Sequence, residues 1–84
     1  MLFGNNNKKP NSMKAQIQTI YGRNAEYLKA DRKSDYSVAV QYQNEPSKIY
    51  WIRSWEIAKV HFKQSLISAD KFCKLLLIPF KESL

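Results

Sequence analysis

Few side chains in this 84-residue chain could perform covalent chemistry, and they form no familiar catalytic motif. His61 and Cys73 are the only base and thiol that could pair, and they fall on different predicted segments without an oxyanion-loop signature. The seven acidic residues form no tight cluster typical of a metal site or of paired-acid catalysis. Gly4 and Gly22 cannot make a phosphate-cradling loop. The sequence therefore predicts a protein that is not an enzyme and that uses no metal or cofactor.

The cysteine content and the hydropathy pattern indicate where such a chain functions. A single cysteine cannot form an intramolecular disulfide, and the absence of a Cys-x-x-Cys pair excludes the common structural zinc motifs. The N-terminus lacks the apolar segment of a secretory signal. The longest apolar run, residues 75–78, is far shorter than the roughly 20 residues that span a bilayer. We expect a soluble cytoplasmic protein without a membrane partner.

Net charge is the most informative feature of the whole composition. Fourteen Lys and Arg residues against seven Asp and Glu give a net charge of +7, which favours binding to polyanions. The excess is spread along the chain, so a binding patch has to be assembled by folding. The alternative is a scattered charged surface that only keeps the protein soluble.

Turn signals divide the chain into segments of strand length. Residues 1–12, rich in Asn, Lys and Pro, have no hydrophobic period and are expected to form a flexible arm, followed by a single domain over 13–84. Turn-forming residues at 22–24, 31–35 and 44–47 separate the segments that follow. The fold class is therefore predicted as α+β, with an antiparallel β-meander of three to four strands followed by one or two C-terminal helices packed on one sheet face.

The predicted strands differ in how clearly they alternate. Residues 36–43 place Tyr36, Val38, Val40 and Tyr42 on one face, and residues 48–53 are rich in aromatic and β-branched side chains, so we expect these segments to form a hairpin. Residues 13–21 also favour a strand. Residues 25–33 fit a helix or a strand, and the regular spacing of the turns favours the strand.

The C-terminal part of the chain indicates helices. Ser54 can cap a helix in which apolar residues recur every three or four positions as far as Leu66. A second apolar strip of this helix, formed by Ile57, Val60 and Ile67, is the predicted interface of a possible homodimer. Residues 68–70 can cap a short second helix that ends before Pro79, although residues 74–80 could instead be a last strand.

Alternation would gather cations and rings on the outer face of the sheet. If Ile17, Leu28, Val38 and Val40 face the helix and Trp51 is buried, the opposite face presents amides, lysines and tyrosines. The outward side chains on this prediction are Lys14, Gln16, Gln18, Tyr27, Lys29, Gln41, Gln43, Lys48 and Tyr50. The residues expected to contact nucleic acid are Lys14, Arg23, Tyr27, Lys29, Arg32, Lys33, Lys48, Tyr50 and Arg53. The alternative is that the tyrosines pack between strands and the lysines only protect sheet edges.

Two functions fit these features. The first is a small non-enzymatic protein that binds single-stranded DNA or RNA, because ammonium groups attract phosphates and aromatic rings stack on bases. The second is a small regulator or inhibitor, of the kind found on mobile genetic elements, that binds a larger acidic protein. Binding that weakens steeply with salt is expected of the first.

Overall fold

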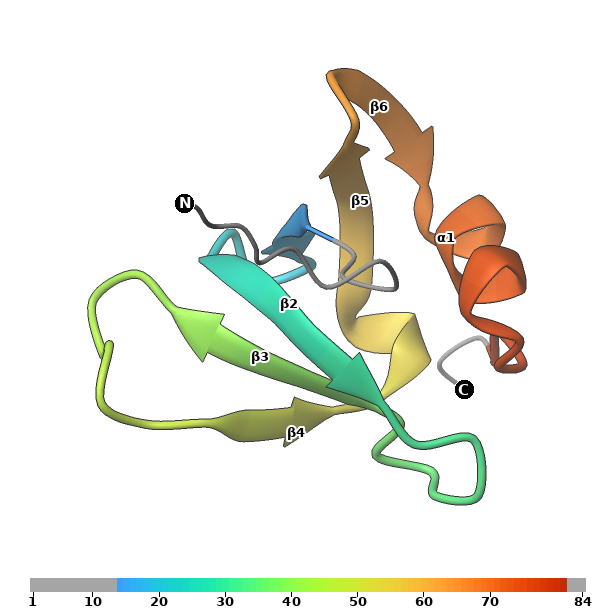
Figure 1. Cartoon of the computed structure of the whole chain (residues 1–84), viewed down its shortest axis with the longest axis horizontal. Helices are drawn as coiled ribbons and strands as arrows, with labels where there is room; N and C mark the ends of the chain where they lie inside the picture. The colour runs from blue at the N-terminus through green and yellow to red at the C-terminus, as the bar shows by residue number, and fades with distance from the viewer. Residues whose placement is uncertain (1–13, 82–84) are drawn as a thin grey trace, which may run out of the picture.

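The computed structural model describes residues 14–81, and the predicted arm 1–12 lies outside this range. The chain forms a single antiparallel sheet with the strand order β4-β3-β2-β1-β5-β6, and a C-terminal helix packs against it (Figure 1). The elements in chain order are β1 (Ala15–Thr19), β2 (Asn24–Ala30), β3 (Val38–Tyr42), β4 (Tyr50–Ile52), the 3₁₀ turn η2 (Ser54–Glu56), β5 (Ile57–Phe62), β6 (Ser65–Ser68) and α1 (Ala69–Leu76). The α+β class is confirmed, but the sheet has six strands instead of three to four.

The first four strands form the predicted meander. Each pairs with its neighbour in the chain, and β3 pairs with β4 in the expected hairpin. The segment that fitted either a helix or a strand is β2. Gly22 ends the turn between β1 and β2 with a φ of 81°, a left-handed conformation that glycine adopts without steric cost.

The long helix predicted from Ser54 is wrong. Only η2 is helical there, and the chain then forms β5 and β6. One reason is a register shift where β5 pairs with β1, which affects the second apolar strip of the predicted helix: Gln18 lies opposite Lys59, but Thr19 lies opposite Ile57. Ala58 is thus an extra residue, a β-bulge, and the buried residues on either side of it are three positions apart. That spacing imitates the period of a helix.

The turn between β5 and β6 also carries no familiar sequence signal. Lys63 and Gln64 both have positive φ, at 51° and 65°, and Phe62 pairs with Ser65 across them. Two central residues with positive φ define the tight hairpin turn that normally contains Asn-Gly or Gly-Gly. Here two long side chains adopt this conformation, so the turn could not be read from residue type.

The second predicted helix is confirmed as α1. The Ser68 hydroxyl accepts a hydrogen bond from the Lys71 amide at 3.1 Å, which caps the first turn. At the other end Leu77 adopts a left-handed conformation with φ 62°, and the Ile78 amide donates to the Cys73 carbonyl at 3.0 Å. The alternative of a strand over 74–80 is therefore wrong.

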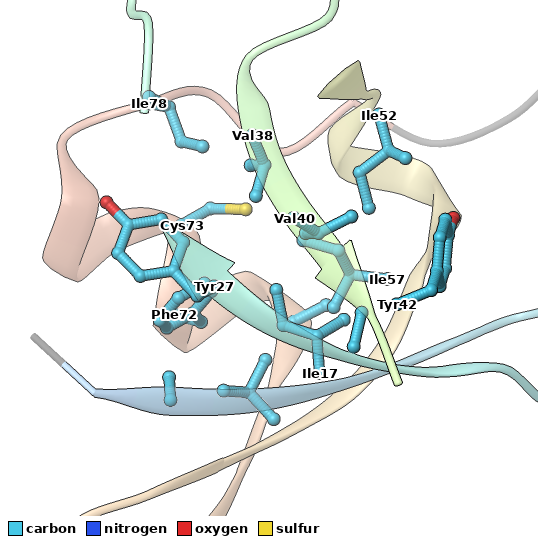
Figure 2. Close-up of a cluster of buried hydrophobic side chains, with 14 residues drawn as sticks. Ile17, Tyr27, Val38, Val40, Tyr42, Ile52, Ile57, Phe72, Cys73 and Ile78 are labelled. Carbon is cyan, nitrogen blue, oxygen red and sulfur yellow. The ribbon is translucent and has the colours of Figure 1, made fainter. Parts of the chain in front are cut away.

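The hydrophobic core lies between α1 and one face of the sheet (Figure 2). Phe72 and Cys73 of α1 are fully buried there, and Ile78 closes the core after the helix ends. Ile57 and Val60 also belong to this core, and Ile67 is half-buried against it. The prediction that these three form a dimer interface is corrected, because on β5 and β6 they pack inside their own chain.

Candidate nucleic-acid interface

The sheet face opposite α1 is polar, and we call it the open face. Because Ala15, Ile17 and Thr19 are buried in the core, the alternate side chains Gln16 and Gln18 point to the other side. Their partners on neighbouring strands extend this face in register. The open face comprises Lys14, Gln16, Gln18, Asn24, Glu26, Lys29, Ala39, Gln41, Gln43, Trp51, Lys59, His61 and Leu66.

Lys29 and Trp51 form the ring-bearing part of the open face. Both lie opposite Ala39, one on each neighbouring strand, and the Lys29 Nζ is 5.9 Å from the centroid of the Trp51 ring. The small side chain between them lets the lysine reach over the tryptophan. Trp51 was expected in the core, but it is 39% exposed, and Ile52 is the buried residue of β4. The open face therefore carries an exposed ring that the sequence reading had assigned to the interior.

For Tyr27 the prediction is wrong in the opposite sense. It was expected on the outer face, but it is buried, and its ring contacts Phe72 of α1. Burial raises the pKa of its hydroxyl. A second bulge explains why Tyr27 and Lys29, two positions apart, point to opposite faces of the sheet. Tyr27 lies opposite Val40 and Lys29 lies opposite Ala39, so Leu28 between them is an extra residue, and it is exposed. Lys29 remains on the open face, as predicted.

Three of the predicted contact residues instead surround one carboxylate. Glu45 accepts hydrogen bonds from the Tyr50 hydroxyl at 2.6 Å and from an Arg23 nitrogen at 2.9 Å, and the Lys48 Nζ lies 3.8 Å away. The Arg23 guanidinium also lies 3.7 Å from the centroid of the Tyr42 ring. The hydrogen bonds from the tyrosine and the arginine lower the pKa of Glu45. These contacts hold the β3–β4 loop and engage Arg23, Lys48 and Tyr50 within the chain, and Arg23 lies beside Asn24 and Gln43 at the edge of the open face.

Arg53 is likewise engaged within the chain. Its guanidinium carbon lies 4.8 Å from the Tyr36 ring centroid and 4.6 Å from that of Trp55. Its Nε donates to Glu56 at 3.0 Å, and this hydrogen bond raises the pKa of the arginine. The side chain is therefore a packing element at η2, and Trp55 is half-buried beside it.

The cations of the open face are free of ion pairs. Within residues 14–81, Lys14, Lys29 and Lys59 form no ion pair within 4.0 Å, and all three are exposed. Glu26 is the single carboxylate among the residues that define the face. This face therefore presents net positive charge to solvent.

A shallow hollow of about 300 Å³ crosses the β2, β1, β5 and β6 strands on the open face. Its polar lining consists of four amides, an ammonium and an imidazole, from Gln16, Gln18, Asn24, Gln43, Lys59 and His61. Amide groups both donate and accept hydrogen bonds, which suits the edges of nucleobases, and the ammonium suits a phosphate. Sequence alternation had predicted Gln16, Gln18 and Gln43 here, but Lys59 and His61 were missed because β5 was assigned to a helix.

Arg32 and Lys33 lie on the exposed β2–β3 loop, beyond the end of β2 that carries Lys29. The Lys33 amide donates to the Asp31 carboxylate at 3.0 Å, which orders the start of this loop. The side chains of Arg32 and Lys33 are exposed, as the sequence predicted.

Comparisons with protein-family models, with curated proteins and with solved structures found no match for this chain. Over residues 14–81, no group of three His, Cys, Asp or Glu side chains is placed to hold a metal ion. In the same range, no helix has the length and apolar character needed to cross a membrane. Function must therefore be inferred from the geometry and charge of the open face.

Proposed function

We propose that the protein binds single-stranded nucleic acid through the open face. The observation that carries this proposal is the combination of unpaired Lys29 and Lys59 with the exposed Trp51 ring and the amide-lined hollow on one surface. Lysines supply the attraction to phosphates, and an exposed indole stacks on a base for roughly 1–3 kcal/mol. Since every base has a stacking face, this chemistry tolerates any sequence.

Single strands fit this surface better than a duplex. The open face is a sheet, and the only α-helix of the described residues has its apolar side in the core. Major-groove reading usually relies on a projecting helix or β-ribbon, whereas a strand with unstacked bases can lie across a sheet and contact its rings and amides.

A binding titration with matched charge variants tests this function. Fluorescence anisotropy of a labelled oligonucleotide would be measured for the wild type and for Lys29→Gln/Lys59→Gln. The double variant should bind more weakly at low salt and show a shallower dependence on salt, because fewer counterions are released. The control is Lys71→Gln/Lys63→Gln, which removes the same charge from α1 and from the β5–β6 turn.

The control decides between a defined surface and bulk charge. Equal weakening in both double variants would contradict the open face as the binding surface. Oligonucleotide binding by the wild type that is no tighter than that of any basic protein would instead favour the acidic protein partner.

A further inference from the structure

A second, smaller hollow lies where the β2–β3 loop meets η2 and the segment after α1. Its volume is about 120 Å³, and it shares no lining residue with the hollow on the open face. Arg32, Lys33 and Lys81 supply its cations, and Ser34, Ser37 and Ser54 supply its hydroxyls. Segments far apart in the sequence thus converge on one small polar pocket.

The charge of this pocket is positive. Asp35 is the single carboxylate in its lining, and the Lys81 Nζ lies 3.1 Å from that carboxylate. Within the described residues, the side-chain nitrogens of Arg32 and Lys33 form no ion pair within 4.0 Å, and the Asp31 carboxylate contacts only the backbone amide of Lys33. Lys81 and Asp35 neutralise each other, so the side chains of Arg32 and Lys33 remain to bind an anion.

Two of the serine hydroxyls in this pocket are positioned by hydrogen bonds from backbone amides. The Ser54 oxygen accepts the Lys81 amide at 3.0 Å, and the Ser34 oxygen accepts the Tyr36 amide at 3.0 Å. Each hydroxyl also carries one hydrogen that it can donate to a ligand. Ser37 and Ser54 are each only 4% exposed, so their positions are held by the surrounding chain.

We propose that this pocket binds one phosphate group. Cationic side chains together with hydroxyl donors match a tetrahedral oxyanion, and the hollow has room for a single phosphate but not for a nucleotide. The phosphate could be free inorganic phosphate or the terminal phosphate of a strand, which offer the same chemistry to the pocket. Only the second source depends on the function proposed above, because the open face uses different residues.

The test follows backbone amide signals by NMR while inorganic phosphate is added at constant ionic strength. Saturable shifts should concentrate at residues 32–37, 54 and 81. The exposed double variant Arg32→Gln/Lys33→Gln should raise the dissociation constant at least tenfold, and Lys63→Gln/Lys71→Gln should leave it unchanged. Absence of saturation, or equal weakening by both double variants, would overturn the proposal.

The two phosphate sources are separated by oligonucleotides with a 5′-phosphate or a 5′-hydroxyl end. A preference for the phosphorylated end that disappears in Arg32→Gln/Lys33→Gln assigns the pocket to strand ends. Equal affinity for both ends, with saturable inorganic phosphate binding, assigns it to the free ion. In Lys29→Gln/Lys59→Gln, inorganic phosphate binding should persist, so failure of the open-face function is distinguished from failure of the pocket.

Discussion

The ring of Phe72 meets the ring of Tyr27 edge to face, with centroids 5.3 Å apart and planes at 89°. Phe72 belongs to α1 and Tyr27 to β2, so this contact holds the helix against the sheet (Figure 2). Both residues are buried, and edge-to-face pairs add roughly 0.5–1.5 kcal/mol to the effect of burial. It is the same contact that removes Tyr27 from the outer surface.

Replacing Phe72 by alanine should lower the free energy of unfolding by roughly 3–5 kcal/mol, because a fully buried ring is lost and a cavity remains. Urea denaturation followed by circular dichroism measures this. Leu75→Ala, on the exposed side of α1, is the control and should change stability by no more than about 0.5 kcal/mol. Similar losses in both variants would contradict the packing of α1 on the sheet.

Replacing Trp51 by alanine should weaken oligonucleotide binding by roughly 1–3 kcal/mol, the value of one base stacked on a ring. Trp55→Ala is the matched control, since it removes the tryptophan that packs on Arg53 and leaves the open face intact. Anisotropy titrations of both variants measure the effect. If Trp55→Ala weakens binding more than Trp51→Ala, the stacking surface lies near η2.

Stability should fall as the pH rises from about 9 to about 11. Burial, with a smaller effect of Asp70, raises the pKa of the Cys73 thiol from 9.0 to about 11. In this window the unfolded chain loses the thiol proton and the folded chain keeps it, so unfolding becomes easier by on the order of 2 kcal/mol. Well below pH 9 both states hold the proton, and the thiol contributes no pH dependence.

Urea denaturation between pH 8 and pH 10.5 measures this loss. Cys73→Ala should show a smaller decline than the wild type, and the remaining decline reflects tyrosines such as Tyr27, whose pKa is also raised by burial. Parallel curves for the two proteins would show that the thiol does not contribute.

Changing Lys63-Gln64 to Asn-Gly should raise the free energy of unfolding by about 1 kcal/mol. Both positions have positive φ, which costs most side chains roughly 1–2 kcal/mol per residue and suits Asn and Gly. Thermal and urea unfolding measure the gain. The same change at Arg32-Lys33, where neither residue has positive φ, is the control and should give no gain. A destabilised Asn-Gly variant would argue against the left-handed turn.

Strand-forming residue types, alternation and the regular spacing of the turns predicted β1 to β4, and capping predicted α1. Buried residues alternate regularly in β1, and turn or cap residues mark the element boundaries, such as Gly22 between strands and Ser68 before the helix. Features that break the pattern were not predictable from alternation. The bulge at Ala58 gave β5 a helical spacing, and the bulge at Leu28 allowed Tyr27 and Lys29 to be placed as they are.

The candidate site was predictable in part for the same reason. Gln16, Gln18 and Lys29 follow from alternation, whereas Lys59 depends on a strand that the bulge concealed. The contacts of Glu45 with Arg23 and Tyr50 could not be predicted from the sequence. A carboxylate on a loop can contact residues that precede it and residues that follow it, and only the fold determines which ones. Periodicity carries no information about such side-chain contacts.

The pairing of β1 with β5 has a consequence for how the chain is made. Ala15 meets Phe62, so one edge of β1 stays bare until most of the polypeptide has left the ribosome. The β1–β4 hairpins are local and can assemble early, but joining the two halves of the sheet involves closing a long loop, which slows folding.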